Sequence, residues 1–293
     1  MSSVIEEWER SGGYLEAAGH RVFAVDRPAG TGVDTDEAVL VLHGFPTSGY
    51  DWHRSLDVLG ARRRVVIPDY PGFGLSAKPD QRYSLFEHAD AVVSVAEQLG
   101  VRNAVLVTHD LGDSVGGEVL ARSLDGTLPF EVTQRVITNG SVYMDLVQLS
   151  VGQQLLLSLP DERLPEGAGP DRDALVGALA GTLAPDADVP AGELEAHADL
   201  IVRDGGNRVL PRTIRYIEER RVHEGRWTGA IERHPAPLTI VWGDLDPIAV
   251  WPMAERLHER RPDATLVRLD GIGHYPMVES PERFNAALEH ALG

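Results

Sequence analysis

The chain has 293 residues, of which 43% are hydrophobic and 25% charged, and its formal net charge at pH 7 is −18. This length and composition are typical of a globular protein with one large domain or two smaller ones. The absence of cysteine excludes a disulfide scaffold, a thiolate zinc site and a cysteine nucleophile, and the acidity disfavours nucleic acid and anionic membranes as partners.

The N-terminus shows no targeting signal. It carries Glu6, Glu7 and Glu9 and has no apolar segment of the kind that a signal peptide needs. The longest apolar runs, such as residues 38–42 and 155–157, are too short to cross a bilayer. We therefore expect a cytoplasmic protein.

Strand-like and helix-like segments alternate along most of the chain. Short runs of β-branched and aliphatic residues predict strands at residues 38–43, 64–69, 103–109, 135–139, 238–243 and 264–269. Apolar residues at helical spacing predict helices over 85–99, 114–124, 253–260 and 281–292. Buried strands that alternate with helices indicate an α/β fold with a mostly parallel, doubly wound sheet.

The alternation stops between about residues 141 and 234, where helical or irregular sequence contains no convincing strand. Residues 159–169 and 183–192 have the composition of loops. Because the strand pattern resumes at Leu238, we interpret residues 142–233 as a helical insertion between two strands of one sheet. Residues 1–141 and 234–293 then form the core.

The end of the predicted strand 103–109 carries the first candidate for catalysis, Asp110. Ligands bind beyond the carboxyl ends of the strands in an open parallel sheet. Thr108 and Gly112 are small residues two positions on either side, as a nucleophile on a tight strand-turn-helix elbow requires. Ser114 completes a G-x-S-x-G string but should lie one turn into the helix. We expect Asp110 to be the nucleophile; Ser114 as nucleophile and a structural Asp110 stay as alternatives.

The strand end at His43-Gly44-Phe45-Pro46 predicts a second part of the site. Glycine lets the chain turn there, so that the Phe45 N–H and the Leu111 N–H could form an oxyanion hole. The Phe45–Pro46 bond is a candidate for the cis form. An ordinary strand-to-loop turn is the alternative.

Two residues after the last two strands complete a candidate triad. Asp110, Asp246 and His274 follow the chain order nucleophile, acid, histidine of α/β-hydrolase triads. Asp246 is favoured because it lies further into its loop than the alternative, Asp244. His109 flanks the nucleophile and is expected to form part of the site wall. We expect six further histidines to be solvated or to have local partners: His53, His88, His197, His223, His258 and His290.

No motif for a metal ion or nucleotide is present, so the sequence predicts neither a metal site nor a cofactor. The partners expected are a small apolar substrate and water, while the sequence leaves the oligomeric state open.

Together with residues 69–74, Asp-Tyr-Pro-Gly-Phe-Gly, these motifs resemble the α/β-hydrolases with an aspartate nucleophile, namely epoxide hydrolases and haloalkane dehalogenases. Residues 109–115 and 216–227 are most similar to the mesoderm-specific transcript subgroup. The resemblance covers most of the chain. It implies an α/β-hydrolase fold in which the insertion is a helical cap.

The resemblance also implies a two-step reaction. Asp110 would attack a saturated carbon and form an ester, which water activated by His274 and Asp246 would then hydrolyse. Tyr216 matches a cap tyrosine that protonates the epoxide oxygen, and His43 is placed on the same substrate side as His109. The sequence departs from the family in two ways, because Leu111 stands where many epoxide hydrolases have Trp and no earlier cap tyrosine is matched near Gln153 and Gln154.

Epoxide opening is therefore the favoured activity, and dehalogenation by the same mechanism is the alternative. Dehalogenases supply side-chain N–H donors to the halide, which Leu111 and Phe45 lack, although Trp227 would supply one if it faced the site. A serine-type esterase that uses Ser114 and a non-catalytic protein on the same fold are less favoured.

Overall fold

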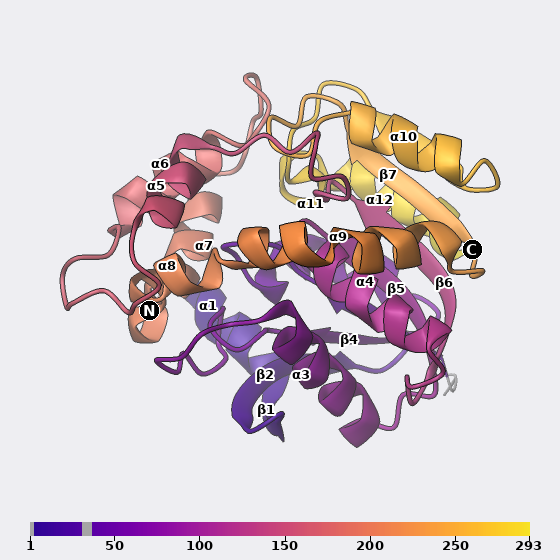
Figure 1. Cartoon of the computed structure of the whole chain (residues 1–293), viewed down its shortest axis with the longest axis horizontal. Coiled ribbons are helices and arrows are strands. Elements are labelled where there is room, and N and C mark those ends of the chain that lie inside the picture. Colours follow the sequence, from indigo (N-terminus) through magenta and orange to yellow (C-terminus); the bar gives the residue numbers. More distant parts are fainter. Residues whose placement is uncertain (1–2, 31–36) are drawn as a thin grey trace.

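A mixed eight-stranded sheet forms the centre of the computed structural model, which describes residues 3–30 and 37–293 (Figure 1). The strand order is β1-β2-β4-β3-β5-β6-β7-β8. Strands β3 to β8 run parallel, whereas β2 is antiparallel to both of its neighbours. The strands are β1 Gly12–Ala17, β2 His20–Arg27, β3 Glu37–Leu42, β4 Arg64–Pro68, β5 Asn103–His109, β6 Glu131–Thr138, β7 Leu238–Gly243 and β8 Thr265–Leu269.

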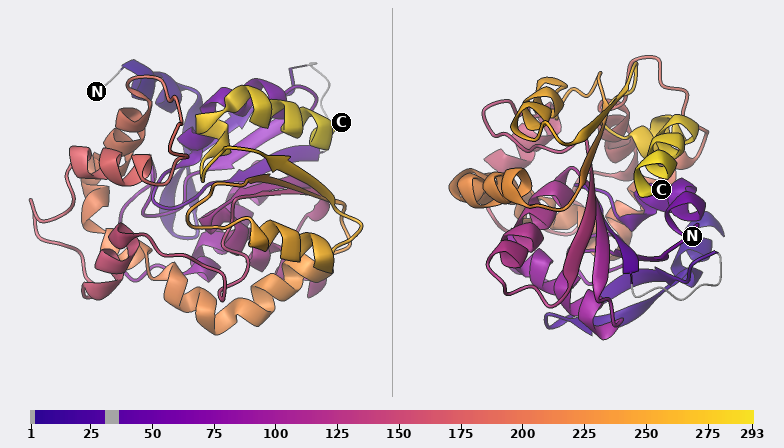
Figure 2. Two further views of the ribbon diagram at one scale, coloured as in Figure 1. Left: turned by 90° about the horizontal axis from the view of Figure 1, so that it is seen from above. Right: turned by 90° about the vertical axis from the view of Figure 1, so that its right-hand side faces the viewer.

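Helices cover both faces of the sheet, which explains the apolar character of its central strands. Figure 2 shows the twisted sheet between two layers, with α4 and α9 on one side and α12 on the other. All six residues of β7 are buried. The mostly parallel α/β fold predicted from the sequence is confirmed.

Helices and 3-10 helices have the following bounds: α1 Ser3–Arg10, η1 Gly49–Ser55, α2 Leu56–Leu59, α3 Leu85–Gln98, α4 Leu111–Leu124, α5 Val151–Ser158, α6 Arg172–Ala180, α7 Glu193–Val202, η2 Arg203–Arg208, α8 Leu210–Thr213, α9 Tyr216–Arg233, α10 Pro252–Arg260, α11 Pro276–Glu279 and α12 Pro281–Leu292. Within the described part of the chain, no helix is long and apolar enough to span a bilayer.

The N-terminal hairpin of β1 and β2 was missed by the sequence analysis. Strand β1 begins with Gly12 and Gly13, which weaken a strand signal, and Ala17 is its only buried residue. An edge strand with one poorly buried face gives little alternation to detect.

Helices α5 to α9 follow β6 and precede β7 in the chain. Helices α5 to α8 gather at one end of the molecule in Figure 1, and α9 runs from them across α4. The close approach of α9 depends on Gly117 in α4, because a Cβ there would lie 2.9 Å from the Cβ of Trp227. These helices occupy the range 142–233 that the sequence predicts to be a cap.

A buried ionic cluster joins helix α7 to the core segment η1. The two ring nitrogens of His197 lie 3.3 Å from Asp51 Oδ1 and 3.4 Å from Glu193 Oε1. Burial by itself lowers the pKa of His197, but the two carboxylates raise it to about 9. We expect from the sequence that His197 is solvated or has local partners. The structure shows instead that it is buried and pairs with Asp51 of another element. Its partner Asp51 is distant in sequence, so local patterns could not reveal the pair.

Candidate active site

Asp110 occupies a strained turn between β5 and α4. Its φ of 49° and ψ of −112° lie in a region that non-glycine residues seldom adopt, which is typical of functional sites. Gly112 allows this geometry, because a Cβ there would lie 2.3 Å from the carbonyl oxygen of Leu42. The structure thus places Asp110 at the elbow, while Ser114 lies in the first turn of α4 and its Oγ accepts a hydrogen bond from Arg220.

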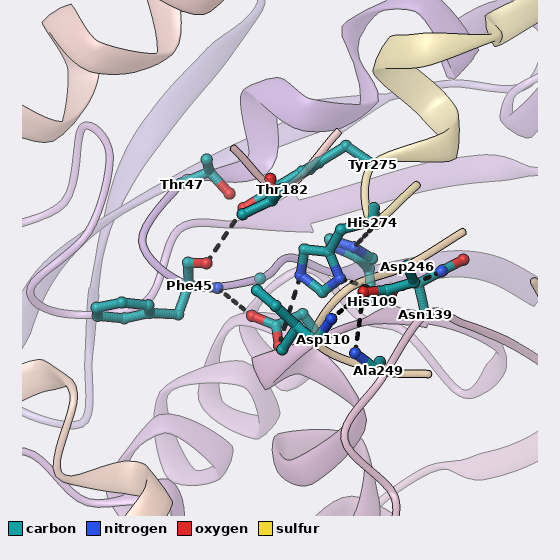
Figure 3. A network of polar contacts seen from close by, with 12 residues as sticks. Phe45, Thr47, His109, Asp110, Asn139, Thr182, Asp246, Ala249, His274 and Tyr275 are labelled. Carbon is teal, nitrogen blue, oxygen red and sulfur yellow. Dashed lines mark hydrogen bonds and ion pairs between the residues drawn. The ribbon is translucent and has the colours of Figure 1, made fainter. Parts of the chain in front are cut away.

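The two carboxylate oxygens of Asp110 have different surroundings (Figure 3). Oδ2 accepts a hydrogen bond of 2.8 Å from the Phe45 N–H. Oδ1 is buried and has no hydrogen-bond partner among the residues that the structure describes, and His274 Nε2 lies 3.9 Å from it. Because Oδ2 is held by Phe45 and Oδ1 has no such partner, Oδ1 is the oxygen available for attack on a ligand. The Leu111 N–H is the first amide of α4, and first-turn amides have no carbonyl partner within their own helix.

His274 is held in place by Asp246. Its Nδ1 forms a hydrogen bond of 2.8 Å with Asp246 Oδ2, so that Nε2 faces Asp110. Asp246 Oδ1 accepts the N–H groups of Ile248 and Ala249 at 2.7 and 2.9 Å. A carboxylate bonded in this way fixes both the tautomer and the orientation of the ring.

The charge of His274 depends on both aspartates. Burial by itself lowers the pKa of His274, but the charge and hydrogen bond of Asp246 and the charge of Asp110 raise it to about 9. The ring is thus protonated at neutral pH. A change in the charge of Asp110 would change the ability of His274 to take up a proton.

Asp244, the alternative acid, lies outside this arrangement. Its carboxylate accepts hydrogen bonds from Arg268 at 2.7 and 3.1 Å and from the Gly271 N–H at 2.7 Å. Asp246 is the residue that the structure brings to His274.

Asn139 belongs to the site but was missed as a functional residue. It follows β6 with a φ of 41°, and its Nδ2 donates to Asp246 Oδ2 at 2.8 Å. Its Oδ1 accepts the Gly243 N–H at 3.0 Å and so ties the ends of β6 and β7 together. The signal was present, because Asn139 ends the predicted strand 135–139.

Tyr216 is the first residue of α9, and its side chain is buried. Its ring centroid is 5.6 Å from that of Phe45. Burial, with a smaller effect from the charge of Asp110, raises the pKa of Tyr216 well above its usual range. The charge of Arg220 and a hydrogen bond with Gln153 act in the opposite direction. Because Gln153 Oε1 already accepts the Ser150 N–H, its NH₂ group is the part that can serve Tyr216.

Three residues expected at the substrate side have structural contacts instead. The Trp227 indole N–H donates to Glu118 at 2.9 Å, and its ring centroid lies 5.3 Å from that of Phe86 in α3, so the expectation of a donor to a leaving group was wrong. His43 uses both ring nitrogens within the core, with the Gly44 carbonyl at 2.8 Å and the Tyr70 N–H at 3.2 Å. The expectation that His43 contacts the substrate was therefore wrong as well.

His109 also contacts the backbone rather than a substrate. Its Nε2 lies 2.8 Å from the carbonyl oxygen of His274, and the two rings are 4.9 Å apart. The expected wall residue therefore supports the loop that carries His274.

A cavity of about 450 Å³ opens beside the triad. Phe45, His274 and Tyr275 form its core side, and apolar side chains of α5, α6 and the segments around them form the rest: Leu155, Leu156, Leu159, Leu164, Leu175 and Leu179. A cavity of this size and character suits an apolar small molecule. In the described part of the chain, no group of three or more His, Cys, Asp or Glu side chains is arranged to hold a metal ion.

Comparison with known proteins identifies the family of this chain. Residues 39–287 match the model of the alpha/beta hydrolase family. LipZ of Mycobacterium tuberculosis, which carries the name of a hydrolase, is 37% identical over 290 residues, covering 98% of this chain and 97% of LipZ. The mesoderm-specific transcript protein of Mus musculus is 33% identical over 298 residues, covering 97% of this chain and 86% of its own.

Solved structures show the same fold. An alpha/beta hydrolase fold protein from Burkholderia ambifaria superposes with a TM-score of 0.74 at 24% identity, covering 94% of this chain and 96% of its own. An esterase from Thermogutta terrifontis superposes with a TM-score of 0.73 at 18% identity, covering 96% and 97%. The family match and the two sequence relatives show that this chain belongs to the alpha/beta hydrolase family.

Proposed function

We propose that the protein is a hydrolase that opens epoxides to diols through an ester on Asp110. The observation that carries this proposal is the position of Asp110 on the elbow. Its Oδ1 has no hydrogen-bond partner in the part of the chain that the structure describes, and its Oδ2 is held by the Phe45 N–H. A carboxylate makes a useful nucleophile toward saturated carbon, because the resulting ester can be cleaved by water.

In the first step, Oδ1 of Asp110 forms a bond to an epoxide carbon and the C–O bond breaks. The departing oxygen takes a proton from Tyr216, so that no free alkoxide forms. The product of this step is a neutral hydroxyalkyl ester, in which Oδ2 is the carbonyl oxygen.

In the second step, His274 takes a proton from water, and the hydroxide adds to the carboxyl carbon of Asp110. The negative charge then falls on Oδ2, which the Phe45 N–H already contacts. The Leu111 N–H, at the start of α4, is the second donor of this proposed oxyanion hole. One such backbone donor is typically worth about 10²–10³ in rate. The ester bond breaks, and the diol oxygen receives the proton from His274. Asp110 is left as the carboxylic acid and returns its proton to His274, which restores the resting state.

Esterification prepares His274 for this step. The charge of Asp110 helps to keep His274 protonated in the resting protein. The ester has no charge, so the pKa of His274 falls and the ring gives up its proton, which passes through solvent to the Tyr216 phenolate.

The cavity indicates the substrate class. Its apolar lining suits a small apolar epoxide, with water as the second reactant. An epoxide is favoured over a haloalkane because Tyr216 offers a proton, whereas the Trp227 indole is bonded to Glu118. Dehalogenation by the same two steps is the competing outcome of the test.

The test is a substrate panel of styrene oxide, 1,2-dibromoethane and p-nitrophenyl acetate with wild type, Asp110→Ala and Ser114→Ala. We expect diol formation from styrene oxide that Asp110→Ala abolishes and Ser114→Ala retains. Halide release without diol formation would favour the dehalogenase. Ester hydrolysis that Ser114→Ala abolishes, together with fluorophosphonate labelling of Ser114, would contradict the assignment of Asp110.

A further inference from the structure

Arg220 is a buried cation that the steps above do not use. It lies on α9 one turn after Tyr216 and is 1% exposed. Its Nη1 donates to Ser114 Oγ, but Nε and Nη2 have no hydrogen-bond partner among the described residues. Buried donors of a charged group are costly to leave unpaired, which points to a ligand.

A small cavity lies against Arg220. Its volume is about 10 Å³, close to the room that one water molecule needs. Ser141, Gln153, Tyr216 and Arg220 supply its polar lining. Gln153 and Ile248 also line the large cavity, so the two spaces adjoin.

Three carboxyl groups act on the charge of Arg220. Asp113 faces it from the first turn of α4, Asp110 from the turn before α4, and Glu224 from its own helix. Asp113 is buried, and burial raises its pKa well above the usual range in spite of the Thr108 hydrogen bond and the Arg220 charge. Although these carboxyl groups are near, Nε and Nη2 of Arg220 stay without a hydrogen-bond partner among the described residues, and this geometry points to a ligand.

We propose that Arg220 and the small cavity form an anion subsite that receives the charge leaving the reacting carbon. The ligand class is a monovalent anion such as a halide; in epoxide opening, the charge that reaches the subsite is that of the Tyr216 phenolate formed when Tyr216 protonates the departing oxygen. The proposal rests on the proposed function of Asp110 for its catalytic meaning, but the subsite itself binds anions without turnover.

The step balances for both leaving groups. In epoxide opening, the electron pair of the C–O bond goes to oxygen and the proton comes from Tyr216. Arg220 then stabilises the tyrosinate until the proton released by His274 after esterification restores Tyr216. In dehalogenation, the carbon–halogen pair leaves with the halide, which Arg220 holds.

The first arm of the test measures bromide binding as a rise in melting temperature, with fluoride and sulfate at equal ionic strength as comparison salts. Wild type and the inactive Asp110→Ala should each gain about 2 °C at a bromide concentration near ten times Kd. Arg220→Met removes the guanidinium, and Ser141→Val places an apolar side chain in the small cavity. Neither variant should show a rise in melting temperature with bromide. Arg226→Met is the matched control, because Arg226 lies on the same helix but pairs with Glu118.

The second arm follows ester formation from styrene oxide by mass in the His274→Gln background. Adding Arg220→Met should slow this step by about 10²–10³-fold, Arg220→Lys should restore part of the rate, and Arg226→Met should leave it unchanged.

The two arms separate the two proposals. An equal bromide response in wild type, Arg220→Met and Ser141→Val overturns the anion subsite. The anion subsite is also overturned if Arg220→Met forms the ester at an unchanged rate while circular dichroism shows that the variant is folded. If no substrate forms an ester in any variant, the function of Asp110 fails while the bromide arm still decides the subsite.

Discussion

The charge of His274 should depend on Asp110, and removing that carboxylate tests the link directly. Asp110→Asn keeps the shape of the side chain and removes its charge, and Asp110→Ala removes both. At 3.9 Å between His274 Nε2 and Asp110 Oδ1, the attraction is about 4 kcal/mol for an effective dielectric of about 20 and about 1 kcal/mol for that of water. Since one pKa unit corresponds to about 1.4 kcal/mol, the pKa of His274 should fall from about 9 by roughly one to three.

The assay is NMR titration of protein with ¹³C-labelled histidine. The chain has 11 histidines, and the signal missing from His274→Gln identifies His274. Asp244→Asn is the matched control, because its carboxylate pairs with Arg268, and should leave the pKa of His274 near 9. A pKa near 9 in both Asp110 variants would refute the idea that esterification converts His274 into a base.

Three further predictions test Tyr216 as the proton donor, the large cavity as the substrate site, and the contact of His197 between α7 and η1. Tyr216→Phe should slow ester formation from an epoxide by about 10²–10⁴-fold but leave reaction with a haloalkane nearly unchanged, as followed by intact mass in the His274→Gln background; equal slowing of both would contradict its role as an acid. Leu175→Trp should reduce kcat/KM for styrene oxide by about 10–200-fold relative to propylene oxide, whereas Val176→Trp, outside the cavity lining, should not; an unchanged ratio would exclude the cavity as the substrate site. His197→Gln should lower the free energy of unfolding by about 3–5 kcal/mol at pH 6.5. The raised pKa of His197 means that its contribution is complete below about pH 6.5 and is lost as pH rises through about 9, so a deficit in urea unfolding that is equal at pH 6.5 and pH 10 would contradict the charged pair.

The sequence sufficed to locate the elbow and the order of the triad. The run that forms β5 ends directly at Asp110, and Gly112 two residues later is needed for close contact with β3. Asp246 and His274 follow the predicted strands of β7 and β8. These signals are local or depend on chain order, so a single sequence contains them.

Features that depend on helix rotation and strand register could not be predicted from the sequence. The segment at 218–221 has two glutamates followed by two arginines, and nothing in it shows that Arg220 turns into the core. The direction of Trp227 depends on the closeness of α9 to Gly117. Asn139 reaches Asp246 only because β6 and β7 pair side by side.

The ester on Asp110 is the centre of this account, and the most direct measurement is its capture. His274→Gln retains the nucleophile and lacks the base, so incubation with styrene oxide should leave the protein heavier by the mass of one substrate. Peptide mass mapping should place this addition on Asp110. An addition on Ser114 instead, or an unmodified His274→Gln protein when wild type consumes styrene oxide, would contradict the mechanism.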